Sequence, residues 1–393
     1  MTTGAAELPD QNSPVPRTVI VVGAGLVAMA SAWQLGLRGH HVQLLAPDLA
    51  HQPVPDGALL SGSRAALGIL MGQVFHRSSG RAWRLRQRSL TLWQQWCDAL
   101  AAQGPGIPRR QGLLLLAAEP EELERQRRLV DERRARGFPL ELWERERLLA
   151  LEPQLPGGAL GALWSPQDGQ LDAGVALEQL TAAAEQAGVE LLAGSALTLE
   201  RCGAGSWRLQ RSPGDPLEAE VVVLANGLGA TGLLASLDAD LAEAWPLEPV
   251  LGQALELELA DTMPDTPWRH WPGVVVWQGM NLVPRPDLPG GRRFWLGATV
   301  EPGRQGLPEA LAHLRQLGGA APAWLEGATV RRHWQGLRPR PAGRPAPLLE
   351  VLAPGLLLAS GHHRNGVLLT PASAEWVVQQ VEGATPGGHL SQR

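Results

Sequence analysis

The stretch that decides the fold lies near the start of the chain and reads Thr18-Val19-Ile20-Val21-Val22-Gly23-Ala24-Gly25-Leu26-Val27-Ala28. Its first half is a continuous, mostly β-branched run, which is typical of a buried parallel strand. Gly23 permits a tight turn and Gly25 lets the backbone approach a pyrophosphate closely, while Ala28 stands where the pattern has its third glycine. The stretch therefore predicts a dinucleotide-binding turn between a strand and a helix that starts at Leu26.

The elements around this turn give the motif its meaning, because a lone GxGxxA pattern is a weak signal. We expect a helix over Leu26 to Arg38 and a second strand over His41 to Leu45. This order is that of a Rossmann unit, for which the alternative is a similar unit that binds no dinucleotide. The acid that binds the ribose should follow the second strand, but Ala46 occupies its place. Asp48 is the expected substitute, since Gln43 falls inside the strand.

The last part of the chain holds a second informative stretch, which reads Gly361-His362-His363-Arg364-Asn365-Gly366-Val367-Leu368-Leu369-Thr370-Pro371. A buried strand over Gly355 to Ala359 should lead into it, and a helix over Ala372 to Val381 should follow, with Thr370 as its N-cap and Pro371 in its first turn. Arg364 would then lie just outside a helix N-terminus. Free N–H groups and a partial positive charge at that place suit a ring that becomes anionic on reduction. The alternative is an ordinary connection with a solvated arginine.

The composition excludes several classes of chemistry. The 393 residues suggest two domains, and the net charge of −5 gives no reason to expect nucleic acid as a partner. The chain has no Lys and no Tyr, so all 34 basic residues are Arg. Without Lys there is no Schiff base, and hence no pyridoxal-phosphate chemistry and no lysine nucleophile. Without Tyr there is no Tyr/Lys pair for proton transfer.

The cysteines and the hydropathy pattern bear on location. Cys97 and Cys202 lie far apart and form no Cys-x-x-Cys pair, which excludes a thiol–disulfide flavoenzyme and predicts a cytoplasmic protein. No cluster of His, Cys and carboxylates suggests a metal site. Thr18 to Leu37 is uncharged, but glycines interrupt it at the predicted turn, so we expect neither a membrane span nor a signal peptide. Residues 1–16 are polar and proline-rich and predict a disordered tail.

The rest of the chain suggests an α/β protein with an inserted second domain. Ser63 to Gly68 is rich in small residues and could present N–H groups and a hydroxyl to a second phosphate, with a plain flexible loop as the alternative. Asp168-Gly169 is expected to be a turn, and the pattern is rich in strands from Leu247 to Val300. These signals divide the chain into two domains. A Rossmann-like nucleotide-binding domain comprises residues 17–101, 151–244 and 331–385. A mixed-sheet α+β domain comprises residues 102–150 and 245–330.

Five motifs together resemble those of the FAD-dependent amine oxidases of the D-amino-acid oxidase and sarcosine oxidase group. They are Gly23-Ala24-Gly25, Ser63 to Gly68, Ala225-Asn226-Gly227, Trp334-Gln335-Gly336-Leu337-Arg338-Pro339, and Gly361 to Leu369. The resemblance covers about residues 18 to 383 and is strongest to the glycine oxidase branch, which serves thiamine thiazole synthesis. It implies an FAD-binding domain with a mixed-sheet substrate domain above the flavin.

The resemblance also implies a set of site residues and a reaction. FAD would be held without a covalent bond, and Arg364 and Arg338 would bind a substrate carboxylate, for which Arg offers a planar, bidentate grip. A structural ion pair is the alternative for Arg338. Oxidation of glycine or a similar small amine would pass a hydride from Cα to the flavin N5 and leave an imine. The implied FAD-binding residues are Gly23, Gly25, Leu26, Ala28, Asp48, Ser63, Arg64, Ala66, Gly68, Leu197, Ala225, Gly227, Gly361, Arg364, Asn365, Gly366, Val367 and Leu368.

The chain departs from the family pattern at two places. Asn281, in Asn281-Leu282-Val283-Pro284-Arg285, stands where the subgroup often has a Tyr beside the substrate, so it is a candidate for binding the carboxylate or the amine. Some relatives use the positive charge of a Lys near the flavin N5 for the reaction with oxygen, but this chain has no Lys. His362, His363 and Arg64 are the residues considered as alternative sources of that charge. The other functions considered are a sarcosine or D-amino-acid dehydrogenase with another electron acceptor, and a non-catalytic flavin-binding protein. The sequence leaves the oligomeric state open, including a homo-oligomer.

Overall fold

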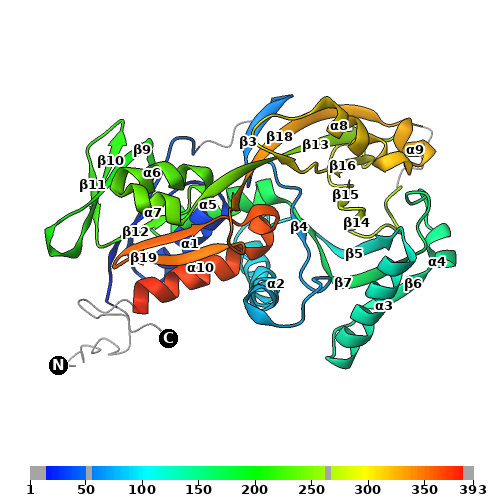
Figure 1. Ribbon diagram of the computed structural model, residues 1–393, viewed down its shortest axis with the longest axis horizontal. Coiled ribbons are helices and arrows are strands. Elements are labelled where there is room, and N and C mark those ends of the chain that lie inside the picture. Colours follow the sequence, from blue (N-terminus) through cyan, green and yellow to red (C-terminus); the bar gives the residue numbers. More distant parts are fainter. Residues whose placement is uncertain (1–14, 50–54, 262–266, 384–393) are drawn as a thin grey trace, which may run out of the picture.

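A six-stranded sheet carries the dinucleotide-binding turn at one end of the molecule (Figure 1). The computed structural model describes residues 15–49, 55–261 and 267–383. The strand order is β19-β20-β12-β1-β2-β8, and all neighbours are parallel except β19 and β20. The strands are β1 (Thr18–Val22), β2 (His41–Ala46), β8 (Glu190–Ala193), β12 (Val221–Leu224), β19 (Leu348–Ala353) and β20 (Leu356–Ser360).

Layers cover both faces of this sheet, which explains the apolar run in β1. Val19 and Val21 belong to a core shared with the helix over Gly80–Ala101 and with three further helices, whereas Ile20 and Val22 belong to a core on the opposite face, and all four side chains are buried. The three further helices are α1 (Leu26–Leu37), α5 (Ala173–Gln186) and α10 (Gly366–Gly383). The opposite layer is made of β9 (Ser195–Arg201), β10 (Trp207–Ser212), β11 (Leu217–Ala219), α6 (Ala230–Leu237) and α7 (Ala239–Ala244).

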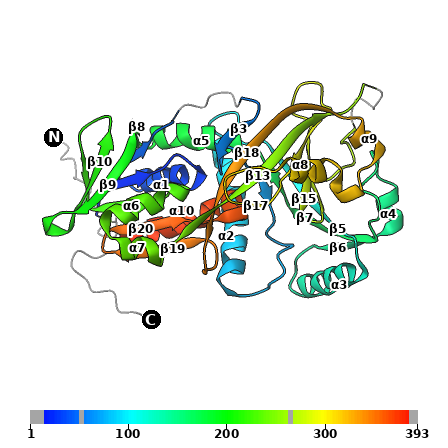
Figure 2. The same ribbon diagram turned by 45° about the horizontal axis from the view of Figure 1, so that its top comes forward.

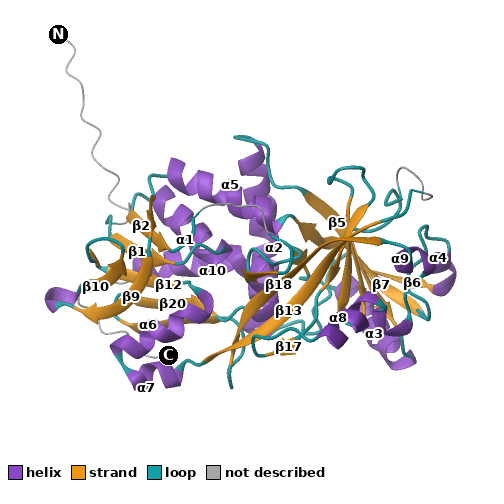
Figure 3. Ribbon diagram, turned by 90° about the horizontal axis from the view of Figure 1, so that it is seen from above, coloured by secondary structure: helices purple, strands orange, loops and turns teal. Residues whose placement is uncertain are grey.

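An 11-stranded mixed sheet forms the other end of the molecule. Its order is β3-β18-β13-β16-β15-β14-β5-β7-β4, with β17 paired to β13 and β6 paired to β7. The strands are β3 (Ala58–Ser61), β4 (Ile69–Leu70), β5 (Arg109–Ala117), β6 (Glu141–Glu144), β7 (Gly161–Leu171), β13 (Leu247–Glu258), β14 (Val274–Trp277), β15 (Met280–Arg285), β16 (Arg293–Gly297), β17 (Glu301–Pro302) and β18 (Thr329–Pro341). Figure 3 shows the long antiparallel pair β13 and β18 running from the first sheet into the second.

The remaining helices lie around the second sheet and between the two sheets. They are α2 (Gly80–Ala101), α3 (Pro120–Ala135), α4 (Arg145–Leu149), α8 (Pro308–Arg315) and α9 (Ala323–Glu326). Helix α2 packs on α10, and α3 packs against β5, β6 and β7 at the end far from the first sheet (Figure 2). Within the described ranges, no helix has the length and apolar character needed to cross a membrane.

The predicted turn at Asp168-Gly169 is wrong, because both residues lie inside β7. The buried Asp168 carboxylate accepts hydrogen bonds from the N–H groups of Gly72 (2.7 Å), Gln73 (2.9 Å) and Val74 (3.0 Å). A polar residue here therefore holds a neighbouring loop, and the strand continues through it. Strands β7 and β18 also belong to the 11-stranded sheet, whereas the predicted division places them with the nucleotide-binding segments. The division itself stays a prediction, and most of the expected tail lies outside the described residues.

The predicted start of the last helix is also wrong. Helix α10 begins at Gly366, so Pro371 lies inside it and Thr370 is not its N-cap. Thr370 Oγ1 instead donates to the Gly366 carbonyl at 2.7 Å. A proline has no N–H for the carbonyl four residues earlier, and that carbonyl belongs to Val367. The indole N–H of Trp93 donates to it at 2.9 Å, so the helix continues through the proline without a lost hydrogen bond.

Candidate active site

The turn after β1 forms a cradle that leaves no room for side chains. Gly23 has a φ of +121°, and a Cβ there would lie 2.7 Å from the Ala225 carbonyl oxygen. A Cβ on Gly25 would lie 2.9 Å from Ser63 Oγ, which accepts a 3.0 Å hydrogen bond from the Leu26 N–H. The N-cap residue of α1 is Gly25, which has no side chain, so the positive end of the helix dipole faces the cradle beside the Ser63 hydroxyl. This geometry fits the pyrophosphate of a dinucleotide.

The expected ribose-binding acid is engaged by an arginine. β2 ends at Ala46, and Asp48, which follows it, forms a 2.8 Å ion pair with Arg64. This pair links the end of β2 to the loop that begins at Ser63. Leu197 lies on β9 with an exposed side chain, and Ala28 is fully buried in α1. The roles predicted for these residues toward a cofactor stay predictions.

The loop from Ser63 to Gly68 rests directly on the second sheet. Gly68 has a φ of +75°, and a Cβ there would lie 1.7 Å from the Leu171 carbonyl oxygen. A Cβ on Gly336 of β18 would lie 2.2 Å from the Cβ of Ala65. The Trp334 indole donates to the Ala65 carbonyl at 3.0 Å. Small residues on both sides thus allow this loop to lie between the two sheets.

The stretch from Gly361 to Leu368 connects β20 to α10. His363–Asn365 form a single 3₁₀ turn, and His363 has a φ of +51°, which is rare for a residue other than glycine. Asn365 Oδ1 accepts a 3.1 Å hydrogen bond from the buried Arg86 of α2. Because α10 starts at Gly366, its first N–H groups lie immediately after Arg364. The helix N-terminus is therefore closer to the arginine than the sequence predicts.

Arg338 and Arg364, the two predicted carboxylate ligands, lie close enough to influence each other. Burial, together with the nearby charge of Arg364, lowers the pKa of Arg338 to about 10. Arg338 Nη1 donates to the carbonyls of Thr299 (3.0 Å) and Leu251 (3.3 Å), whereas its Nε–Nη2 edge makes no hydrogen bond with any described residue. Arg364 Nη2 donates to the Gly279 carbonyl at 3.0 Å. The pair can therefore offer N–H donors to one carboxylate.

Asn281 lies on the same face of the second sheet as Arg338. Paired residues of neighbouring strands share a face, and the register pairs Asn281 with Gly297 and Gly297 with Ala254 of β13. Side chains alternate along a strand, so Val250, four residues before Ala254, is on this face too. Its partner on β18 is Arg338. The side chain is buried, and its Nδ2 donates to the Gly297 carbonyl at 2.9 Å. Its Oδ1 makes no hydrogen bond within the described residues. Asn281 therefore presents an acceptor, which suits an amine N–H rather than a carboxylate.

The two histidines do not supply the positive charge considered for them. Burial lowers the pKa of His362 to about 4, and His362 Nε2 lies 2.8 Å from Ser373 Oγ. Burial and the charges of Arg338, Arg364 and Arg340 lower the pKa of His363 to about 4. Both rings are neutral at pH 7, so guanidinium groups, among them those of Arg338, Arg364 and Arg86, carry the positive charge near this loop. Among the described residues, no group of three His, Cys, Asp or Glu side chains could hold a metal ion.

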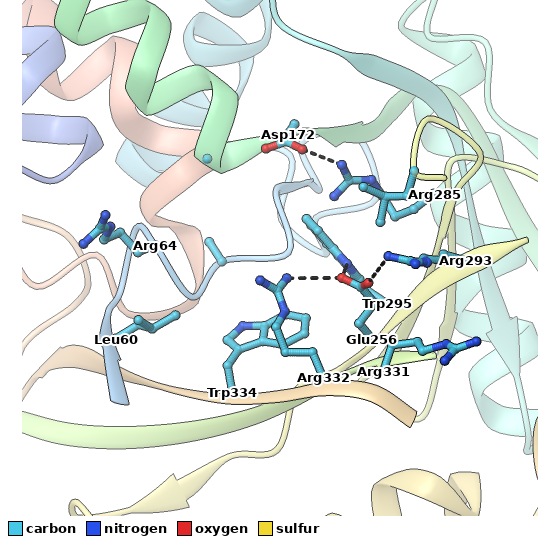
Figure 4. Close-up of a pocket in the computed structure, with 13 residues that line it drawn as sticks. Leu60, Arg64, Asp172, Glu256, Arg285, Arg293, Trp295, Arg331, Arg332 and Trp334 are labelled. Carbon is cyan, nitrogen blue, oxygen red and sulfur yellow. Dashed lines mark hydrogen bonds and ion pairs between the residues drawn. The ribbon is translucent and has the colours of Figure 1, made fainter. Parts of the chain in front are cut away.

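A cavity of about 540 Å³ lies beside the Ser63–Gly68 loop, from which Arg64 and Ala66, two of the predicted FAD-binding residues, contribute to its wall (Figure 4). Trp334 and Arg338 occupy the same face of β18, and Gly336, on which Ala65 rests, lies between them. Trp334, Trp295 and Leu60 line the cavity together with a network of ion pairs. The pairs include Arg285–Asp172 (2.5 Å), Arg293–Glu256 (3.0 Å) and Arg332–Glu256 (3.2 Å). These ion pairs oppose charges of opposite sign within the wall, although one buried nitrogen of each of these arginines has no hydrogen-bond partner among the described residues. None of the predicted substrate-binding residues lines the cavity.

Sequence reasoning missed several residues that shape this site. A Cβ on Gly252 of β13 would lie 2.0 Å from Arg338 Nη2, so the guanidinium lies directly over this glycine. A glycine within a strand is a general signal of such close approach. Arg86 beneath Asn365 and Thr299 beneath Arg338 gave no signal, because their role depends on contacts between distant segments.

The whole described chain can be compared with known proteins. Residues 18–380 match the profile of the family described as DAO, FAD dependent oxidoreductase. The chain is 28% identical to a glycine oxidase of Geobacillus kaustophilus over 373 residues, which covers 93% of this chain and 92% of that one. It is 27% identical to a bifunctional protein ThiO/ThiG of a Nostoc species over 374 residues, which covers 93% of this chain. The chain spans about half the length of that bifunctional relative, or 52%.

The fold of this chain is also similar to that of a relative whose crystal structure is known. The crystal structure of the Geobacillus kaustophilus glycine oxidase superimposes with a TM-score of 0.78 at 26% identity, and covers 94% of this chain and 95% of that one. Its mixed α/β architecture confirms the predicted fold class. The profile match and the cradle at the first turn confirm FAD as the cofactor. This protein therefore belongs to the family of FAD-dependent oxidoreductases of the D-amino-acid oxidase type.

Proposed function

We propose that the protein oxidises glycine or a similar small amino acid or amine, using FAD that is held without a covalent bond. Bound FAD would supply the hydride acceptor for the hydrogen that leaves the substrate Cα. The observation that carries this proposal is the pair Arg338 and Arg364, which lies beside the loop and helix that would hold the flavin.

The substrate carboxylate would bind to the free edge of Arg338, with Arg364 beside it. Hydrogen bonds between a guanidinium and a carboxylate contribute about 1.5–3 kcal/mol each. The Asn281 Oδ1 would accept a hydrogen bond from the amine. Fixing both ends of a small amino acid in this way orients its Cα, and orientation is the main contribution that such a site makes.

FAD itself would lie along the predicted residues. The Gly23–Gly25 turn, Leu26 and Ser63 would hold the pyrophosphate, because they combine close backbone approach with a helix N-terminus. The loop through Ala66 and Gly68 and the first turn of α10 would hold the ring. The positive end of the α10 dipole would then stabilise negative charge on the reduced cofactor.

A dehydrogenase that acts on sarcosine or a D-amino acid with another electron acceptor is the second candidate. It is favoured by the absence of Lys and by the neutral His362 and His363, which leave only guanidinium charges near the predicted ring. For either enzyme we propose a cytoplasmic location, in line with the two isolated cysteines. A role in thiamine thiazole synthesis is part of the proposal for glycine.

An anaerobic titration of the yellow, FAD-loaded protein tests the proposal. Glycine, sarcosine and D-alanine are added in turn while the flavin absorbance is recorded. We expect glycine to bleach the flavin, and oxygen uptake against dye reduction then separates oxidase from dehydrogenase. Bound FAD that no amino acid bleaches would indicate a non-catalytic flavin-binding protein, and a protein that binds no FAD would contradict the proposal altogether.

A further inference from the structure

Glu301 is a buried carboxylate behind the predicted substrate-binding face. It lies on β17 opposite Leu251 of β13, and its side chain is almost fully enclosed. It accepts hydrogen bonds from the Leu307 N–H (2.5 Å), from Gln253 Nε2 (3.1 Å) and from Thr299 Oγ1. Every one of these partners is a donor, so both carboxylate oxygens act as acceptors.

Thr299 connects this carboxylate to Arg338. Its hydroxyl donates to Glu301 and accepts a 2.7 Å hydrogen bond from the Gln253 N–H, while its own N–H donates to the Gln253 carbonyl at 3.2 Å. Its carbonyl accepts the 3.0 Å hydrogen bond from Arg338 Nη1. The position of that carbonyl therefore depends on how Glu301 holds the threonine.

The charge of Glu301 also matters, because Arg338, which is partly buried, lies close to the like charge of Arg364, which is exposed. Arg364 and burial both disfavour the charged form of Arg338, and Glu301 acts in the opposite sense by raising its pKa. Without a counter-charge, repulsion would turn the two guanidinium groups apart whenever no substrate carboxylate lies between them. Glu301 offsets this repulsion from behind the sheet.

We propose that Glu301, acting through Thr299, is a positioning residue that keeps the Nε–Nη2 edge of Arg338 directed at the substrate carboxylate. The inference rests on the proposed function, in which Arg338 binds that carboxylate. Glu301 does not touch the substrate. It contributes by holding the guanidinium in its binding geometry before the substrate arrives, which reduces the cost of ordering it.

The test uses FAD-loaded protein and two small probes, acetate for the carboxylate site and methylamine for the amine site. Glu301→Gln keeps the size of the side chain and removes its charge. We expect the acetate Kd and the glycine KM to rise about tenfold, the loss that corresponds to one weakened hydrogen bond to a charged group. The methylamine Kd, kcat and FAD content should stay unchanged, whereas the melting temperature should fall slightly, because the new amide NH2 faces hydrogen-bond donors.

Further variants separate positioning from folding. Thr299→Val should reproduce the effect of Glu301→Gln, whereas Thr299→Ser keeps the hydroxyl and should behave as wild type. If Glu301→Gln does not fold, the two threonine variants carry the test. Glu258→Gln is the matched control, because Glu258 lies on the same sheet but pairs with Arg331 at 2.5 Å, far along β13 from Arg338. It should leave acetate binding unchanged.

Two results would overturn the inference while leaving the proposed function intact. One is unchanged acetate affinity in Glu301→Gln and Thr299→Val, with acetate bound by the wild type. The other is equal weakening of acetate and methylamine, which indicates general loss of structure. A wild-type protein that binds no acetate, and that no amino acid bleaches, contradicts the proposed function and this inference together.

Discussion

Replacing Gly252 by alanine tests the position of the Arg338 guanidinium through one added methyl group. That Cβ would lie 2.0 Å from Nη2, 2.4 Å from Cζ and 2.5 Å from Nη1 of Arg338, whereas ordinary contacts begin at 3.4 Å. To reach an ordinary contact of 3.4 Å from the present 2.0 Å, Nη2 of the guanidinium would have to move by about 1.4 Å. Such a shift is too large for the hydrogen bonds of 3.0 Å and 3.3 Å to Thr299 and Leu251 to persist.

The shift should reduce activity without unfolding the protein, because only the far end of a flexible side chain has to move. Misplacement of a binding group by about 1 Å can cost about 100-fold in rate, which corresponds to roughly 2.7 kcal/mol. We therefore expect Gly252→Ala to lower kcat/KM for the preferred amino acid by about this factor, mainly through KM, with FAD still bound. Steady-state kinetics and the flavin spectrum measure both quantities.

Two controls make this test decisive. Gly232→Ala adds the same methyl group on α6, where it meets nothing within 4 Å, and should leave kinetics unchanged. In an Arg338→Ala background the Gly252→Ala change should cost nothing further, because the group it displaces is absent. Two results would show that Arg338 does not bind the substrate from this position. One is a kcat/KM for Gly252→Ala that stays close to wild type. The other is that Gly252→Ala lowers kcat/KM as much in the Arg338→Ala background as it does in the wild type.

Three further changes address the loop, the last helix and pH. Arg364→Ala should raise KM by about 100-fold while FAD stays bound, as steady-state kinetics would show, and unchanged kinetics would remove Arg364 from the site. Trp93→Phe should lower the free energy of unfolding by about 1–3 kcal/mol in urea titrations, since it leaves the Val367 carbonyl without a donor, and adding Pro371→Ala should recover part of this loss. Burial raises the pKa of Asp168 to about 6. Between pH ~4 and pH ~6 the native state therefore keeps a proton on this carboxyl group that the unfolded chain has already lost. The stability from this protonation, about 3 kcal/mol, is complete below pH ~4 and is lost as pH rises through ~6. Thermal melts of wild type should fall relative to Asp168→Asn across that window, and parallel profiles would refute the shift.

The sequence alone determined the nucleotide-binding unit, because its signals are local. The apolar run before Gly23 is buried on both faces of a sheet, and the glycine spacing follows from backbone approach within a few residues. The family motifs around Arg338 and Arg364 identified the candidate carboxylate ligands for the same reason: each lies in a short stretch with its own pattern. The helix expected over Leu26 to Arg38 is likewise observed, over Leu26–Leu37.

Tertiary structure decided the features that depend on partners far along the chain. Helix α10 continues through Pro371 only because Trp93, 274 positions before Val367, supplies the missing donor. Asp168, inside a strand, accepts hydrogen bonds from a loop 94 to 96 positions earlier, and the charge state of His363 depends in part on arginines from a different strand. Burial and charge act through space, so they become visible only when the fold brings these segments together. The same holds for the site itself, since neither the contact of Gly252 with Arg338 nor the support from Glu301 leaves a local pattern in the chain.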